Sequence, residues 1–220
     1  MMLEKSYGEP PEKMEKPLEN IYSSNERLIK LVNDLLNVSR IEAGRIEMKF
    51  EKISLEEIIT SIVEELKNVV KEKGIYLKTE FPKETKVKMR TKFSSPFEKP
   101  KKHLPKVLVD RDKIRQVILN IIDNAIRYTN HGGVTVKIQN PKTKIQIVVS
   151  DTGEGMAKEE IPHLFESFSR GTAGTRFWTE GAGLGRYVAK KFVELHKGKI
   201  WAESKGRGQG SIFYIELPVK

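Results

Sequence analysis

The 220-residue chain contains no cysteine. Disulfide bonds, thiol nucleophiles and thiolate metal sites are therefore excluded, which fits a cytosolic protein. No apolar run reaches the ~18 residues that a membrane-spanning helix needs, and the N-terminus lacks the apolar core of a signal peptide. We therefore expect this part of the protein to lie in the cytoplasm, while a membrane anchor outside it stays open.

Acidic residues are outnumbered by basic ones, 30 against 40, and this gives a formal net charge of +10. Most of the excess lies in one proline-containing segment, 82–106, which has nine Lys or Arg and two Glu. Only Phe93 and Phe97 accompany these charges, so the segment has little to stack against bases. We interpret it as a solvated surface excursion or a docking surface for an acidic partner, and expect no nucleic acid.

The N-terminal part is polar and contains Pro10, Pro11 and Pro17, which indicates a loop or a broken helix. From about residue 18 to residue 48 the spacing of apolar residues predicts one long helix. Its apolar stripe consists of Leu28, Leu31, Val32, Leu35 and Val38. A helix with one apolar face must bury that face. We expect a second helix or a second chain to cover it; the alternative is an ordinary amphipathic helix that packs on the core of its own domain.

Helices and strands then alternate along the chain. Further helices are predicted at about 54–73, 110–127, 158–168 and 184–196, and strands at 75–81, 107–109, 134–139, 144–149, 200–204 and 211–217. Ser54 with Glu57 forms a predicted capping box, Asp110 is a predicted N-cap, and Gly74 and Gly198 are predicted left-handed stops. The buried face of the third helix should comprise Ile114, Val117, Ile118, Ile121, Ile122 and Ala125, and that of the last helix Leu184, Val188, Phe192 and Leu195. Together they predict an α+β fold, a two-layer structure with helices over one face of a mixed sheet.

The third helix carries two asparagines four residues apart. Asn120, Asn124 and Arg127 fall within about 60° of one another, off the apolar face. Amide oxygens suit a Mg²⁺ ion that also holds phosphate oxygens, and an arginine adds charge for phosphate. The alternative is a solvent-facing polar stripe, although asparagine is a poor helix former.

A turn with two glycines follows the strand 144–149. Asp151 stands at the predicted end of the strand, and Gly153 and Gly155 allow close backbone approach. A carboxylate in this place can accept a hydrogen bond from an exocyclic amine, which favours adenine over guanine. The alternative is an ordinary Asp-x-Gly turn.

A third glycine motif, Gly181-Ala182-Gly183-Leu184-Gly185, opens the last helix. Free backbone N–H groups and the helix dipole make such a place suitable for an anion. The spacing matches neither the Rossmann fingerprint nor a Walker A loop. The preceding stretch contains Phe165, Phe168 and Arg170, then becomes small and polar, and has the composition of a mobile lid.

In this order the motifs resemble those of the catalytic domain of bacterial two-component sensor histidine kinases, a branch of the Bergerat-fold ATPases. The resemblance covers the asparagine box at 120–128, the first glycine box at 151–155, the phenylalanine box at 165–168 and the second glycine box at 181–185. Residues 33–44 resemble the end of the second dimerisation helix of such kinases. Lys197 stands where the family often has glycine, and Arg186 where it usually has an apolar residue.

The resemblance implies Mg-ATP binding and transfer of the γ-phosphoryl group to a histidine. Asn124 and Asn120 would hold Mg²⁺, Asp151 would bind the adenine amine, and Asn120, Arg127 and Arg170 would be catalytic. The nucleotide-binding residues implied are Asn120, Asn124, Arg127, Tyr128, Asp151, Gly153, Gly155, Gly181, Gly183, Leu184 and Gly185.

None of the four histidines, at 103, 131, 163 and 196, has the His-Glu/Asp-x-x-x-Pro context of the family's acceptor, and we interpret all four as structural or surface residues. We expect 1–48 to be a partial dimerisation segment without the acceptor and 49–220 to be a complete ATP-binding domain. The chain would then bind Mg-ATP without phosphorylating itself, dimerise through the helical hairpin of the intact protein and serve a response regulator receiver domain. The alternatives are a degenerate adaptor with the same fold, a natural protein without an acceptor, and a Bergerat ATPase of the chaperone, topoisomerase or mismatch-repair type.

Overall fold

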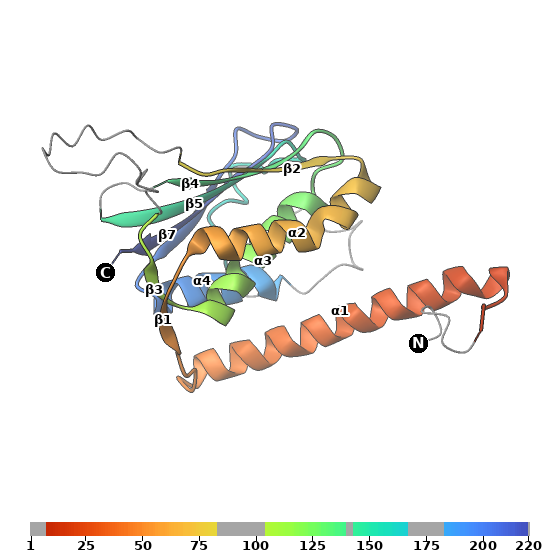
Figure 1. Cartoon of the computed structure of the whole chain (residues 1–220), viewed down its shortest axis with the longest axis horizontal. Helices are drawn as coiled ribbons and strands as arrows, with labels where there is room; N and C mark the ends of the chain where they lie inside the picture. Colours follow the sequence, from red (N-terminus) through yellow and green to blue (C-terminus); the bar gives the residue numbers. More distant parts are fainter. Residues whose placement is uncertain (1–7, 83–103, 140–142, 167–182, 220) are drawn as a thin grey trace, which may run out of the picture. The chain divides into compact units, whose positions relative to one another are not determined.

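The computed structural model describes residues 8–82, 104–139, 143–166 and 183–219. The chain divides into two compact units, Met1–Glu47 with His163–Val188, and Met48–Pro162 with Ala189–Lys220. The elements in chain order are α1 (Glu12–Glu42), β1 (Phe50–Ile53), α2 (Leu55–Lys73), β2 (Tyr76–Glu80), β3 (Val107–Asp110), α3 (Arg111–Arg127), β4 (Gly133–Gln139), β5 (Lys144–Asp151), α4 (Leu184–Leu195), β6 (Lys199–Glu203) and β7 (Ile212–Pro218) (Figure 1). Among the described helices, none is long and apolar enough to cross a membrane.

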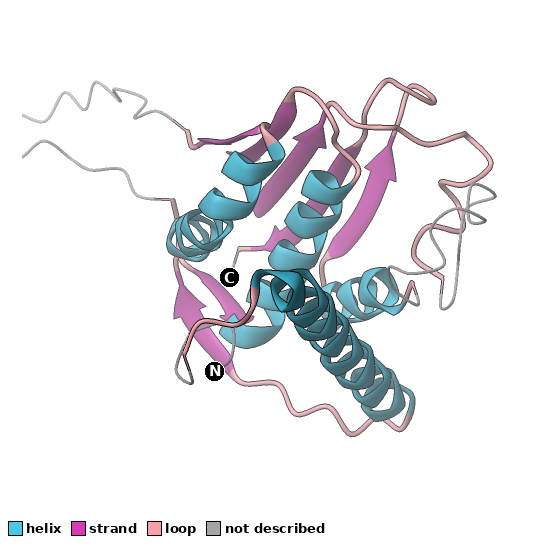
Figure 2. Cartoon of the chain, turned by 90° about the vertical axis from the view of Figure 1, so that its right-hand side faces the viewer, coloured by secondary structure: helices cyan, strands magenta, loops and turns pink. Residues whose placement is uncertain are grey.

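The second unit contains a five-stranded sheet in the order β2-β4-β5-β7-β6. β2 runs parallel to β4, and the other neighbours are antiparallel. Helices α2 and α3 lie against one face of this sheet, as Figure 2 shows from the side. The predicted arrangement, helices over one face of a mixed sheet, is confirmed.

The core of this unit lies between α2, α3 and the covered face of the sheet. The predicted apolar face of α3 is confirmed, because all six of its members are at most 2% exposed. Facing them are alternate residues of the central strands, as the period of two in a strand requires: Val134, Val136 and Ile138 from β4, Ile145, Ile147 and Val149 from β5, and Phe213, Ile215 and Leu217 from β7. Each such side chain contributes about 1.5–3 kcal/mol when it is removed from water.

Strand β1 is not among the strands predicted from the sequence. It pairs antiparallel with β3, with Phe50 opposite Asp110 and Ile53 opposite Val107. The backbone N–H of Lys49 donates to Asp110 Oδ2 at 2.8 Å. Only Ile53 of this four-residue strand is buried. The sequence therefore shows no apolar alternation from which the strand could have been predicted.

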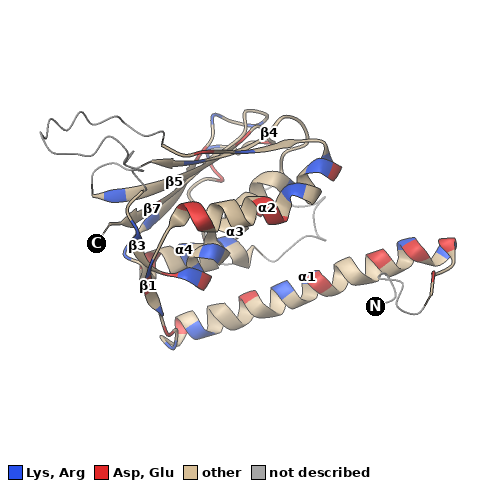
Figure 3. Ribbon diagram, in the orientation of Figure 1, with Lys and Arg blue, Asp and Glu red and all other residues tan. Residues whose placement is uncertain are grey.

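Helix α1 of the first unit begins and ends earlier than predicted. It starts at Glu12, directly after Pro11 at the N-cap, and Pro17 lies inside it. It ends before Ala43 and the left-handed Gly44 (φ 64°) rather than at residue 48. Charged side chains are spread along it (Figure 3). Three members of the predicted stripe, Leu28, Val32 and Leu35, are half exposed or more.

The predicted caps at Gly74 and Asp110 are confirmed, and the capping box predicted at Ser54 is not. Gly74 ends α2 in the left-handed conformation (φ 69°), and Asp110 accepts a hydrogen bond from the N–H of Lys113 at 3.1 Å. Ser54 does precede α2, but its side chain makes no capping bond, so the predicted capping box is not formed.

The predictions for the end of α4 were partly wrong. Leu195 is 42% exposed instead of buried. The left-handed residue is Lys197 (φ 58°) and not Gly198. A Cβ at Gly198 would collide with the carbonyl oxygen of Glu216 on β7. This glycine is therefore required by close approach to a strand, and the lysine before it makes the turn.

The helix predicted at 158–168 is not found over its described residues. Residues 158–165 form successive turns. Pro162 explains this, because proline has no N–H to donate and disfavours a helical conformation at the residue before it.

His196, at the end of α4, is a buried structural residue. Its Nε2 accepts a hydrogen bond from the N–H of Asp110 at 2.9 Å, and its Nδ1 donates to the carbonyl oxygen of Phe192 at 2.6 Å. The ring of Phe50 meets it edge-on at 5.5 Å. Burial lowers the pKa of His196 below its ordinary value, while the bond to Phe192 and the nearby Asp110 carboxylate act in the opposite direction.

We expect the free energy of unfolding of this unit to decrease as the pH falls below the pKa that His196 has in the unfolded chain. The unfolded chain takes up the proton near pH 6.5 and the folded chain only at lower pH. Unfolding therefore becomes easier as pH drops below that value, with a slope of at most about 1.4 kcal/mol per pH unit. Denaturant unfolding between about pH 7.5 and pH 5.5 measures it. The slope should shrink in His196→Gln and persist in the matched control His163→Gln; an unchanged slope in His196→Gln would contradict the assignment.

Candidate functional site

The two asparagines of α3 are in direct contact. The Nδ2 of Asn124 donates to the Oδ1 of Asn120 at 3.1 Å, which confirms that they share one face of the helix. Both side chains are half-buried. Among the described residues no donor reaches the Oδ1 of Asn124. This oxygen is consequently available to a ligand.

The last turn of α3 brings Arg127 and Tyr128 to the same end of the helix. The Nη2 of Arg127 lies 3.6 Å from the Oδ2 of Asp123. Tyr128 occupies the C-cap position and is 38% exposed. Thr129 is fully buried, and its Oγ1 donates to the carbonyl oxygen of Ala125 at 2.7 Å. The end of the helix is therefore fixed in place while its two largest polar side chains keep access to solvent.

Asp151 is the final residue of β5 and is held by the loop that follows. Its Oδ1 accepts hydrogen bonds from the N–H groups of Gly153, at 2.9 Å, and Ser211, at 3.1 Å. Its Oδ2 receives none from the described residues. Burial raises the pKa of this carboxyl above its ordinary value, and the two backbone hydrogen bonds oppose that shift. The carboxylate thus presents one oriented acceptor oxygen.

Gly153 is required where α3 and this loop meet. A Cβ at Gly153 would collide with the carbonyl oxygen of Tyr128, which itself accepts a hydrogen bond from the N–H of Glu154 at 3.0 Å. The asparagine helix and the Asp151 loop are thus joined directly. The sequence predicted both motifs, and the structure brings them into contact.

The turn between β6 and β7, which the sequence analysis did not assign to the site, supports the Asp151 loop. Ser204 Oγ accepts from the N–H of Met156 at 3.0 Å and donates to the carbonyl of Gly210 at 2.7 Å. A Cβ at Gly155 would collide with the carbonyl of Gly206, and one at Gly210 with that of Asp151. The Gly-x-Gly-x-Gly-Ser spacing at 206–211 was the signal available in the sequence.

The third motif begins α4 and lies in the first unit. Gly183 is left-handed (φ 72°), Leu184 is buried and Gly185 lies in the first turn of the helix. The Nε of Arg186 donates to the carbonyl oxygen of Leu164 at 3.1 Å. Gly181, Arg170 and Phe168 lie outside the described residues, as do residues 83–103 and all of 169–182.

The described residues include no cluster of three or more His, Asp or Glu side chains that could hold a metal ion. The donors present are instead the amide oxygens of Asn120 and Asn124. Such neutral oxygens suit Mg²⁺ when phosphate oxygens and water complete the shell. The residues therefore fit a magnesium ion that arrives with a nucleotide.

Residues 109–220 match the family model described as histidine kinase-, DNA gyrase B-, and HSP90-like ATPase. Because the match covers just over half of the chain, this protein belongs to that family of ATPases. Within it, the chain carries a catalytic, ATP-binding domain of the two-component sensor histidine kinase type, with the predicted Bergerat-type fold.

Two curated relatives extend over most of the chain. The non-motile and phage-resistance protein of Caulobacter vibrioides is 31% identical over 92% of this chain and 22% of its own length. The adaptive-response sensory kinase SasA of Crocosphaera subtropica is 30% identical over 96% of this chain and 51% of its own length. The chain thus spans about a fifth of the length of the first relative and about half of the length of the second.

Solved structures share the fold. Full-length ShkA in complex with AMPPNP has a TM-score of 0.74 and 26% identity, covering 99% of this chain and 41% of ShkA. The catalytic domain of the histidine kinase ThkA has a TM-score of 0.60 and 26% identity, covering 78% of this chain and 98% of that domain. The likeness to ThkA in complex with the response regulator TrrA is at 24% identity and concerns the fold alone.

Proposed function

We propose that this chain binds Mg-ATP and transfers the γ-phosphoryl group to a histidine on a polypeptide segment other than its own described residues, for relay to an aspartate of a response regulator receiver domain. The observation that carries the proposal is the pair of open acceptors, Asn124 Oδ1 and Asp151 Oδ2, on two motifs that touch through Gly153 and Tyr128. Since ATP is made and kept in the cytoplasm, the proposal also places this part there.

The proposed roles follow from the chemistry of each group. Asp151 Oδ2 accepts from the exocyclic amine of adenine, while Gly153 and Gly155 allow the close backbone contacts with Tyr128 and Gly206 that hold this loop in place. Asn124 and Asn120 supply amide oxygens to Mg²⁺, whose charge offsets that of the phosphates. Arg127 and Tyr128 lie on the same helix end and add a cation and a hydroxyl donor.

The phosphate half of the site is assigned by sequence position. Gly181, Gly183, Leu184 and Gly185 supply backbone N–H groups to the phosphate chain at the start of α4, where the helix dipole favours an anion. Arg170 stabilises the transferring phosphoryl group. Positioning and electrostatic stabilisation supply most of the catalysis in phosphoryl transfer.

The proposed organisation is a partial dimerisation segment, 1–48, followed by a catalytic domain, 49–220. The half-exposed apolar side chains of α1 support a homodimer through the helical hairpin of the intact protein, because such a stripe requires a cover. Three histidines are described: His196 is buried and bonded on both nitrogens, His163 is exposed beside Glu166, and His131 is exposed. None has the sequence context of an acceptor.

Transfer in trans tests the proposal. The chain is incubated with γ-labelled Mg-ATP and a separate polypeptide that carries the His-Glu/Asp-x-x-x-Pro segment of a sensor kinase. We expect acid-labile label on that polypeptide and none on the chain itself. No label on the acceptor while calorimetry shows bound ATP would overturn the kinase proposal and favour the adaptor alternative.

A further inference from the structure

Lys73, the last residue of α2, has no role in the site described above, yet it contacts the helix that carries the asparagines. Its Nζ donates to the carbonyl oxygen of Ile126 at 2.7 Å and to that of Arg127 at 2.6 Å. These carbonyls belong to the last turn of α3, whose oxygens have no partner within the helix. A lysine from a neighbouring helix therefore caps the C-terminus of α3.

The other groups of this turn are also bonded. The N–H of Tyr128 donates to the carbonyl of Asn124, and the hydroxyl of Thr129 to that of Ala125. With Lys73 on the next two carbonyls, four successive oxygens, from Asn124 to Arg127, are occupied. The carbonyl of Tyr128 comes next, and it receives the N–H of Glu154 in the Asp151 loop. Lys73 of α2 and Glu154 of that loop thus bond to consecutive carbonyl oxygens at the C-terminal end of α3.

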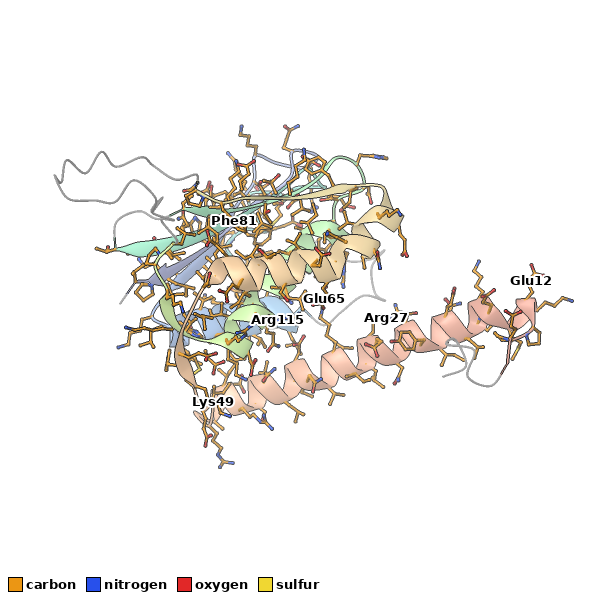
Figure 4. All side chains as sticks on the ribbon, viewed as in Figure 1. Glu12, Arg27, Lys49, Glu65, Phe81 and Arg115 are labelled. Carbon is orange, nitrogen blue, oxygen red and sulfur yellow. The ribbon has the colours of Figure 1, made fainter. Side chains whose placement is uncertain are left out.

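The charge of Lys73 suits this place. The C-terminal ends of helices carry partial negative charge, and a cation within the last turn stabilises them. Lys73 is the last residue of α2, and its ammonium contacts the last turn of α3. A second connection between the helices, Arg115 to Glu65, lies on the surface nearer the start of α3 (Figure 4). An exposed pair of that kind contributes little to rigidity.

We infer that Lys73 is a positioning residue of the nucleotide site: it fixes the end of α3, and through Tyr128 and Glu154 it sets the spacing between the asparagines and Asp151. The inference rests on the proposed function, because the spacing matters only if one ligand uses both motifs. Lys73 touches no reacting atom and acts through the backbone of α3. A misplacement of about 1 Å that originates far from the reacting atoms can lower the rate by about 100-fold.

The test compares Lys73→Met with Lys73→Arg, which restores a cation of similar reach. We expect Lys73→Met to weaken ATP binding about tenfold and Lys73→Arg to recover most of it. The matched control Lys71→Met removes an exposed lysine from the same turn. A second control, Ile62→Val, shortens a fully buried side chain of α2 about three turns before Lys73; it should lower Tm and leave the Kd unchanged.

NMR of the protein without nucleotide gives a readout independent of ATP. In Lys73→Met the backbone amide of Glu154 and the side-chain amide of Asn124 should shift, and in Lys73→Arg they should return. If Lys73→Met lowers Tm as Ile62→Val does but keeps both resonances and the Kd, the positioning role is wrong. If the wild type binds no ATP, the proposed function fails, and the two resonances alone then decide whether Lys73 fixes the end of α3.

Discussion

Asp151→Asn is expected to abolish ATP binding, with a Kd raised by about 100-fold or more. When one partner of a buried hydrogen bond becomes incompatible, the site loses the bond and also leaves buried polar groups unpaired. The N–H groups of Gly153 and Ser211 both donate to Asp151 Oδ1. An asparagine that keeps these two bonds must place its NH₂ group where Oδ2 was. That NH₂ would face the amine of adenine, donor against donor.

Calorimetric titration with Mg-ATP measures this effect. The matched control is Glu154→Gln in the same loop, since Glu154 is exposed and, within the described part of the chain, forms hydrogen bonds through its backbone; its Kd should stay within about twofold of wild type. A Kd for Asp151→Asn close to that of the control would remove Asp151 from the adenine site. Loss of binding in both variants would point to collapse of the loop, which the Tm of each variant reveals.

Asn124→Ala is expected to reduce phosphoryl transfer by about 1,000-fold, the upper range for removal of one preorganised electrostatic group. The substitution removes the oxygen proposed for Mg²⁺ and also the donor that holds Asn120. Both amide ligands would be lost or disordered together. ATP affinity should fall much less, because adenine recognition at Asp151 stays intact.

Label transfer to the separate acceptor polypeptide, measured over a series of Mg²⁺ concentrations, tests this result. Asn130→Ala is the matched control, since Asn130 is exposed and lies three residues beyond the end of α3. The control should transfer at the wild-type rate. Equal rates for Asn124→Ala and Asn130→Ala would show that the amide oxygens of α3 are not metal ligands.

The parts of the fold that sequence predicted well depend on local patterns. The buried face of α3, the Asp110 cap and the left-handed Gly74 each follow from neighbours within a few residues. Asn120 and Asn124 are four apart on a helix, so periodicity alone placed them together. Strands β4, β5 and β7 were likewise predicted to within two residues of their observed ends.

The parts that sequence missed depend on residues far apart in the chain. Strand β1 exists because β3 is available to pair with it, some sixty positions later. Gly198 is needed for contact with β7 and not for the helix stop assigned to it. The support that Ser204 gives to the Asp151 loop, and that Lys73 gives to α3, crosses about 50 residues. No local pattern carries such information.

The place of β2 at the edge of the sheet bears on how this protein tolerates changes in length. β2 has one neighbour, β4, whose register fixes it from Tyr76 to Glu80. The next described element along the chain is β3 (Val107–Asp110), which belongs to the other sheet. Doubling the number of residues between two such fixed points adds only about 0.6 kcal/mol of loop-closure entropy. Insertions or deletions between β2 and β3 are therefore expected to leave the register of β2 on β4 unchanged and to alter the free energy of folding very little.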